Sequence, residues 1–156
     1  MKFIPTGSQT VGPFFSIGLD TLCQQPAMSP SPDAVLVQGT IFDGENAPIP
    51  DAVFEFWSDN EFVRAATNED GNFFAVLKQP VNSLYFDVLI FMRGLMRPVL
   101  TRVYLGDERT FKEETSLQRV PPERRNTLCA RAGETKNHFS WDVHMQGDRE
   151  TVFFEF

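Results

Sequence analysis

The segment SLYFDVLIFMRGLMRPVLTRVYLGDE, residues 83–108, contains two apolar runs on either side of a short polar link. The runs, Leu84–Met92 and Val99–Leu105, are rich in β-branched and aromatic residues and have the length of strands. Gly94 and Pro98 lie in the link, where turn residues are expected. The segment therefore predicts a β-hairpin at the centre of the fold. The near-continuous apolarity of the first run also predicts that both faces of that strand are covered.

Three arginines lie close together in the same segment, although the chain as a whole is acidic. They are Arg93, Arg97 and Arg102, and the formal net charge of the chain is −7. The planar guanidinium group suits a carboxylate or a phosphate, which it binds with two parallel hydrogen bonds. The cluster is therefore a candidate anion-binding element.

Outside the hairpin, short runs with strand character alternate with turns rich in Gly and Asp. The further predicted strands are Val35–Phe42, Ala52–Trp57, Val63–Thr67, Asn72–Lys78, Thr127–Ala132, His138–Gln146 and Thr151–Phe156. One short helix is expected in the polar stretch Arg109–Glu123, where Pro121 and Pro122 would end it. Many short strands with regular turns predict an all-β sandwich.

The N-terminal residues 1–34 form a different region. Prolines and glycines break any regular element there, so we expect a loop-like arm. The arm is nevertheless too apolar for a free tail, with Val11, Phe14, Phe15, Ile17 and Leu19 close together. We expect it to pack along another surface, either of its own domain or of a partner. Residues 1–156 are expected to form a single domain that includes this arm.

Composition excludes several classes of function. The acidic charge argues against nucleic acid and anionic membrane surfaces as partners. No apolar run has the length needed to span a membrane, and the N-terminus does not look like a secretory signal. Cys23 and Cys129 are far apart in the sequence, and their spacing is not that of a metal site or a disulfide framework. Two reduced cysteines in a cytoplasmic protein are the expectation.

Several stretches, in the same order along the chain, resemble the alpha-type subunits of the protocatechuate 3,4-dioxygenases, which are intradiol ring-cleaving enzymes. They are Ser8–Phe15 with Ile17–Leu19, Gly39–Gly44 with Pro50–Ala52 and Glu55–Trp57, Ile90–Leu95 with Thr101–Leu105, Arg124–Leu128 with Asp142–Gly147, and Glu150–Phe156. The resemblance implies a two-sheet β-sandwich of the intradiol dioxygenase type. In that family two Tyr and two His hold an iron(III) ion that binds a catechol. Phenolates are hard anionic ligands that favour ferric iron, and the neutral imidazoles complete the site.

This chain departs from the family pattern at the metal site. Its only tyrosines and histidines are Tyr85, Tyr104, His138 and His144. The position of the family's His-x-His pair reads Tyr85-Phe86-Asp87 here. The segment between Trp57 and Tyr85 is short and lacks the tyrosines that catalytic subunits carry. The resemblance therefore implies no metal ligand and no catalytic residue in this chain, with Fe(III) bound instead by a beta-type partner subunit.

By the same resemblance, Thr10, Gly12, Pro13 and Phe14 would line the substrate cavity around the partner's iron. Phe14 departs from the tyrosine that is usual there, so a phenol hydrogen bond would be lost. Arg93 matches an arginine near that cavity, where it would favour the substrate carboxylate. The implied reaction cleaves protocatechuate with O2 to 3-carboxy-cis,cis-muconate.

Simpler interpretations of these residues stay open. Thr10–Pro13 would be only a turn, and Arg93 would only pair with an internal acid. His138, Ser140, Asp142 and His144 fall on one face of a strand and would be a solvated polar face. On a strand His138 and His144 would be roughly 20 Å apart, too far to share a metal ion.

Two metal alternatives also remain. Asp142 and His144 could share a metal ion, and Tyr85 with Asp87 could hold iron as a phenolate–carboxylate pair.

Three functions therefore compete. The first is the alpha-type subunit of a heteromeric dioxygenase. The second is a non-catalytic homo-oligomer with a structural role or a site for a small aromatic or carboxylic acid. The third is a self-sufficient enzyme with a site at Tyr85, Asp87 and the arginines. We rank it last, because these spacings do not bring four ligands together.

Overall fold

The structure is a computed structural model that describes residues 4–12, 14–23 and 34–155. Strands dominate the described residues. They are β1 (Ala34–Phe42), β2 (Val53–Trp57), β3 (Phe62–Ala66), β4 (Asn72–Lys78), β5 (Tyr85–Phe91), β6 (Val99–Leu105), β7 (Cys129–Ala132), β8 (His138–Ser140) and β9 (Val143–His144). The helical elements are α1 (Phe14–Leu19) and α2 (Thr115–Gln118), with the 3₁₀ turns η1 (Asp20–Leu22), η2 (Glu108–Phe111) and η3 (Pro122–Leu128).

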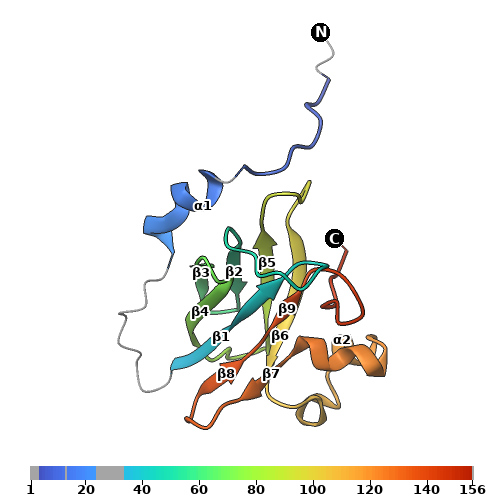
Figure 1. Ribbon diagram of the computed structural model, residues 1–156. Helices are drawn as coiled ribbons and strands as arrows, with labels where there is room; N and C mark the ends of the chain where they lie inside the picture. Colours follow the sequence, from blue (N-terminus) through green and yellow to red (C-terminus); the bar gives the residue numbers. More distant parts are fainter. Residues whose placement is uncertain (1–3, 13, 24–33, 156) are drawn as a thin grey trace.

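The strands form one curled sheet in the order β3-β2-β5-β6-β7-β8-β1-β4, and β9 pairs with β1 beside this path (Figure 1). Strands β3 and β4 lie at opposite ends of this order, yet a turn at residues 67–71 joins them, in which Asn68 N donates to Asn72 O. The sheet therefore curls back on itself. The predicted all-β fold is confirmed, with two facing halves that β7 connects.

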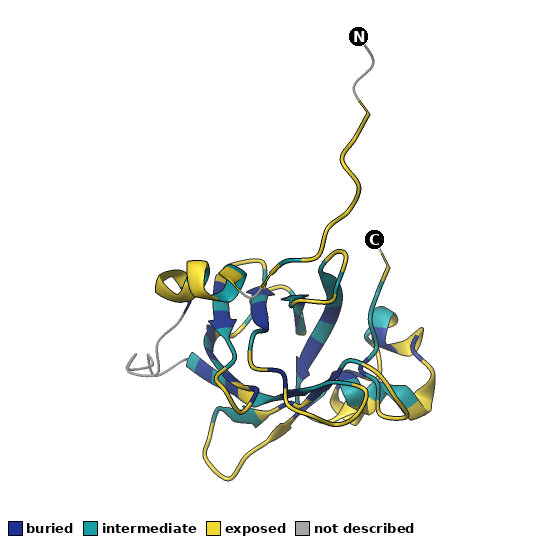
Figure 2. Cartoon of the chain, turned by 45° about the horizontal axis from the view of Figure 1, so that its top comes forward, coloured by how far each residue is buried: buried dark blue, intermediate teal, exposed yellow. Residues whose placement is uncertain are grey.

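The hydrophobic core lies between these halves, and buried residues alternate with less buried ones along β3, β4 and β5 (Figure 2). Strand β1 contributes Val35, Val37 and Ile41. The other strands add Phe54, Phe56, Val63, Ala65, Phe73, Ala75, Leu77, Phe86, Val88, Ile90, Val103 and Val143. This period of two is the signature of a sheet with one face in the core.

The predicted central hairpin is present. Strands β5 and β6 pair antiparallel from Tyr85 opposite Tyr104 to Ile90 opposite Val99. Strand β5 also pairs with β2, so it lies inside the sheet. No residue of β5 is exposed, in agreement with the prediction that both its faces are covered, although the residues that point out of the core are only half-buried.

The predicted strand His138–Gln146 is divided into β8 and β9. Both parts pair parallel with β1, and between them Trp141 N donates to Gln38 O. A Cβ atom on Gly39 would lie 1.8 Å from the Trp141 carbonyl oxygen. Only glycine permits this approach, so Gly39 is required where the last strands cross β1.

The helical turns after β6 differ from the expectation of one short helix. Three elements, η2, α2 and η3, follow one another, and Pro122 begins η3 rather than ending a helix. Proline suits this place because the N–H of a first turn has no partner within the helix. Since η3 continues to Leu128, β7 begins two residues later than predicted. These turns cover the outer face of β6 and bury Tyr104, Phe111 and Leu117.

Both ends of the chain also differ from the sequence expectation. Short helical elements, α1 and η1, interrupt the N-terminal arm, and Gly12 O accepts from Phe15 N where α1 begins. The C-terminal segment is not a strand within the described residues, where one isolated bridge joins Phe154 to Leu100. In the part of the chain described by the structure, no helix has the length and apolarity to cross a membrane.

Candidate functional site at the N-terminal arm

The predicted site residue Thr10 is hydrogen bonded to the turn between β5 and β6. Thr10 Oγ1 accepts from Gly94 N at 2.7 Å, across a sequence separation of 84 residues. Gly94 has a positive φ of 91°, a conformation that glycine adopts without strain. The bond brings the arm to the turn that carries Arg93.

The arm leaves the body of the molecule at this point (Figure 1). Residues 4–10 and Gly12 are exposed, and no atom lies within 4 Å of a Cβ built on Gly12. The side chain of Phe14 is 79% exposed, whereas the Phe15 ring packs against Phe91 with 5.5 Å between centroids. Pro13 lies outside the described residues. The structure therefore brings Thr10 to the turn that carries Arg93, and Gly12 and Phe14 follow it on the exposed arm.

Arg93 pairs with an acid of its own chain. Its Nε lies 2.8 Å from Asp51 Oδ2, and the Arg93 side chain is 57% exposed while that of Asp51 is 12% exposed. Both oxygens of Asp51 are buried, and apart from this ion pair they have no hydrogen-bond partner among the described residues. The Arg93 cation therefore neutralises a buried carboxylate. More than half of the Arg93 side chain stays exposed beside this pair.

The three arginines of the hairpin do not converge. Arg102 Nε lies 2.8 Å from Asp87 Oδ1, and the Arg102 guanidinium lies over the Tyr85 ring at 4.1 Å from its centroid. Arg97 is exposed, and no ion pair reaches it from the described residues. Burial lowers the Arg102 pKa, but the hydrogen bond to Asp87 together with the charges of Asp87, Tyr85 and Tyr104 raises it overall. The expected cluster is thus three separate cations.

The tyrosines do not fit an iron site. Tyr104 is fully buried, and its Oη lies 2.9 Å from Glu114 Oε2 and 3.0 Å from Ser116 Oγ. Burial, and to a lesser extent Glu114, raises the pKa of Tyr104 to about 12, so the phenolate needed for ferric iron is disfavoured. Tyr85 and Asp87 are engaged by Arg102, a cation that would repel a metal ion.

The histidines do not fit an iron site either. His138 lies on β8, while His144 is buried on β9 and stacks on Phe42 with 5.0 Å between ring centroids. Burial, together with Arg149, lowers the pKa of His144, and Asp142 acts in the opposite direction. Asp142 Oδ1 already accepts from Thr40 N at 3.0 Å. Among the described residues, no three His, Cys, Asp or Glu groups are placed to hold a metal ion together.

Two curated relatives match nearly the whole chain. The protocatechuate 3,4-dioxygenase alpha chain of Burkholderia cepacia is 30% identical over 190 aligned positions, which cover 96% of this chain and 96% of the relative. The protein belongs to the protocatechuate 3,4-dioxygenase alpha-chain family. The alpha chain of Pseudomonas putida is 28% identical and covers 97% of this chain and 96% of its own length. No protein-family model matches the sequence.

Both family alignments are longer than the 156 residues of this chain. Both alpha chains therefore carry residues that have no counterpart here, in agreement with the expectation that a segment is shortened.

Solved structures of dioxygenases share the fold of this family member. The dioxygenase domain of a dioxygenase carbohydrate-binding protein fusion from Streptomyces sp. SirexAA-E superposes with a TM-score of 0.53 and 13% identity, over 83% of this chain and 97% of that chain. An intradiol ring-cleavage dioxygenase from Tetranychus urticae gives a TM-score of 0.54 and 10% identity, over 74% and 82% of the two chains. The expected β-sandwich of the intradiol type is confirmed.

Sequence reasoning missed Asp51, although it left open that Arg93 pairs with an internal acid. The chain has 21 acidic residues, and nothing in the sequence singles out this one as the partner. Its place two residues before β2 is a weak signal, because that position brings a side chain to the end of the sheet where the β5–β6 turn lies.

Proposed function

We propose that this chain is the alpha-type subunit of a heteromeric intradiol dioxygenase whose beta-type partner holds Fe(III). The complex cleaves protocatechuate with O2 to 3-carboxy-cis,cis-muconate. The iron would act as the Lewis acid that activates the bound catecholate. This chain contributes the walls of the cavity and no metal ligand.

The observation that carries this proposal is the hydrogen bond between Thr10 Oγ1 and Gly94 N. It joins the arm, with Gly12 and Phe14, to the turn that carries Arg93. The resulting surface is exposed in the single chain, so it is available to a partner's active site. The family membership supports the same assignment, because both relatives are named alpha chains.

Arg93 has a defined task in this proposal. Its Nε pairs with Asp51 and its side chain is largely exposed, so its terminal nitrogens would bind the carboxylate of the substrate. A guanidinium in a cavity from which water is excluded binds a carboxylate strongly, because the low dielectric strengthens the charge interaction. Asp51 then acts as a positioning residue that holds the cation at the rim.

The experiment is co-expression of this chain with a beta-type subunit encoded in the same genome. Size-exclusion chromatography with light scattering, iron analysis and O2 uptake with 3,4-dihydroxybenzoate are measured on the product. A complex of both chains with iron in proportion to the beta-type subunit is expected. A single iron-free polypeptide that associates only with itself would instead support the non-catalytic homo-oligomer.

Within that complex, Arg93→Ala should weaken the use of 3,4-dihydroxybenzoate by about 2–5 kcal/mol in kcat/KM, because the substrate carboxylate loses its partner. Arg97→Ala is the matched control, since Arg97 lies on the same turn and is exposed. Both variants are also assayed with catechol, which lacks the carboxylate. An equal loss for the two substrates would remove Arg93 from this role.

A further inference from the structure

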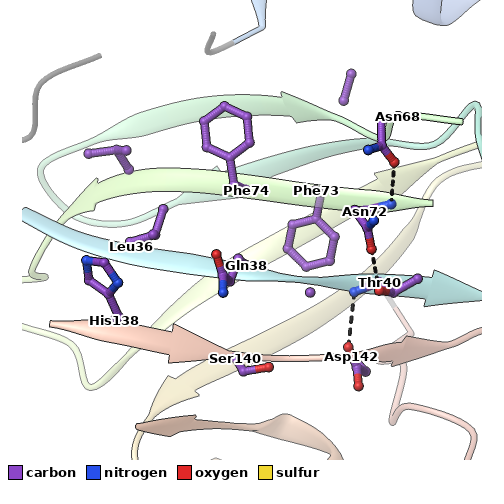
Figure 3. A pocket seen from close by; sticks show the side chains of 13 residues that line it. Leu36, Gln38, Thr40, Asn68, Asn72, Phe73, Phe74, His138, Ser140 and Asp142 are labelled. Atoms are coloured by element: carbon purple, nitrogen blue, oxygen red, sulfur yellow. Dashed lines mark hydrogen bonds between the residues drawn. The ribbon is translucent and has the colours of Figure 1, made fainter. Parts of the chain in front are cut away.

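A groove of about 820 Å³ lies on the outer face of the sheet, and its lining includes neither Arg93 nor any of the described residues 4–12 and 14–23 of the arm. It crosses β4, β1 and β8, and side chains from all three strands point into it (Figure 3). Pockets that bind small molecules have this size and combine an apolar surface with a few polar groups. The function proposed above makes no use of this groove.

One end of the groove is mostly apolar, with His138 of β8 beside Leu36 (Figure 3). Leu36 of β1 and Phe74 of β4 point out of the sheet here, and both are half-buried, so part of each side chain faces the groove (Figure 3). The flat face of a phenylalanine ring offers a stacking surface for another ring. This end therefore favours a ligand with a planar or flat-sided ring.

The other end carries polar groups that the chain already holds in place. Thr40 lies at the centre of this polar end. The Thr40 hydroxyl Oγ1 donates to Asn72 Oδ1 at 2.6 Å, and the Thr40 backbone N donates to Asp142 Oδ1 at 3.0 Å. Asn68 Oδ1 accepts from Asn72 N at 2.9 Å. Figure 3 shows these three bonds as one chain across the groove. The bonds fix each side chain before any ligand arrives, which lowers the entropy lost on binding.

These internal bonds determine which atoms remain for a ligand. Each asparagine uses its oxygen, so the NH₂ groups of Asn68 and Asn72 remain as donors. Asp142 uses Oδ1, so its Oδ2 remains as an acceptor. The side chains of Gln38 and Ser140 also have no hydrogen-bond partner among the described residues, and both line the groove. A hydroxyl group both donates and accepts, so it matches this mixed set.

The charges of the residues that line the groove limit which ligands can bind there. Asp142 is the one carboxylate among the residues that line the groove, and none of them is Lys or Arg. An anionic ligand would meet Asp142 with no Lys or Arg in the lining to offset the repulsion, and the remaining titratable lining residue is His138. The groove is thus the opposite of the Arg93 surface, which suits a carboxylate.

We propose that this groove is a binding site for an uncharged ring that carries neighbouring hydroxyl groups. The ring lies against Phe74, and its hydroxyl groups bond to Asp142 and to the amides of Asn72 and Asn68. An aromatic diol and a sugar ring both have this chemistry.

The test uses the purified full-length chain without a partner, so it does not depend on the proposed dioxygenase function. Saturation-transfer NMR and calorimetric titration are run with catechol, which represents an aromatic diol, and with methyl β-glucoside, which represents a sugar ring. 3,4-Dihydroxybenzoate is the matched anionic probe, because it is catechol with an added carboxylate. We expect at least one neutral diol to bind, and catechol to bind more tightly than 3,4-dihydroxybenzoate.

Variants locate the binding. Phe74→Ala should weaken the neutral ligand about tenfold through loss of ring stacking, whereas Phe62→Ala, an exposed phenylalanine outside the groove, should not. Ser140→Phe fills the groove from an exposed position and should abolish binding even if Phe74→Ala does not fold. Asp142→Asn should reduce the preference for catechol over 3,4-dihydroxybenzoate.

Two results would overturn the proposal. One is the absence of binding by either neutral diol at the solubility limit of the probe. The other is binding that Ser140→Phe leaves intact. If only one of the two neutral rings binds, that result supports the site and shows whether its ligand is an aromatic diol or a sugar.

Discussion

At the scale of single residues, the ion pair between Arg93 and Asp51 explains how a charged side chain is kept at an exposed turn. A carboxylate buried away from water is stable only beside a cation. The ion pair with the buried Asp51 therefore holds the Arg93 side chain in place. The pair therefore contributes to the stability of the isolated chain as well as to the proposed substrate contact. The two contributions can be measured separately.

Arg93→Ala should lower the free energy of unfolding of the isolated chain by about 1–3 kcal/mol, because it leaves the Asp51 carboxylate buried without a partner. Asp51→Asn in the same chain should restore most of this loss, since the neutral amide needs no cation. Urea unfolding of both single variants and the double variant measures the coupling. Purely additive effects would mean that the two residues do not interact in solution.

Tyr104 gives a prediction with a definite direction in pH. Its pKa is raised from 10.0 to about 12, so the neutral phenol stabilises the fold fully below pH 10 and this stability is lost between pH 10 and 12. Tyr104→Phe should remove the late phase of tyrosinate absorbance. Only Tyr85 would then remain to titrate. A late phase that persists in Tyr104→Phe would contradict the assignment.

At the scale of secondary structure, the sequence predicts the strands whose apolar and polar residues alternate regularly. It does not predict the short elements whose local sequence signal is weak. Asn72–Lys78 and Val99–Leu105 have the predicted bounds, because each lies between clear turn residues. The helical turns in residues 108–128 are short and polar, and they are stabilised by tertiary contacts such as Tyr104 with Glu114. Such contacts lie outside the reach of a local pattern.

The division between β8 and β9 depends on Gly39, so Gly39→Ala should destabilise the chain by about 3 kcal/mol or more through the clash with Trp141 O. Gly18→Ala is the control, since no atom lies within 4 Å of a Cβ at that position. It should be neutral or stabilise by up to about 1 kcal/mol. Thermal unfolding of the two variants compares them, and equal transition temperatures would refute the role given to Gly39.

At the scale of the whole molecule, the sequence and its family resemblance predict the β-sandwich but not how the arm meets the body. The contact between Thr10 and Gly94 joins parts of the chain 84 residues apart, and neither residue has a local signal for the other. The same limit applies to Asp51 and Arg93. The sequence therefore offers candidate members such as Thr10 and Arg93, but neither the partner Asp51 nor the arrangement of these residues.

Deletion of residues 1–19 should lower the activity of the assembled enzyme and leave the isolated chain folded. The segment contributes no buried residue among those described, so the core stays intact. Circular dichroism checks the fold, and O2 uptake with 3,4-dihydroxybenzoate checks the activity of the complex. Thr10→Val tests the anchor alone and should have a smaller effect in the same direction. Unchanged activity after the deletion would exclude the arm from the cavity.

The anchored arm also has a consequence for the thermodynamics of association. Ordering one residue of a free chain costs about 1–2 kcal/mol of conformational entropy. An arm already fixed at Thr10 has lost part of that freedom when the chain folds, so less remains to be lost when a second subunit binds. The hydrogen bond to Gly94 thus transfers an entropic penalty from assembly to folding and makes association tighter without adding a contact to the interface.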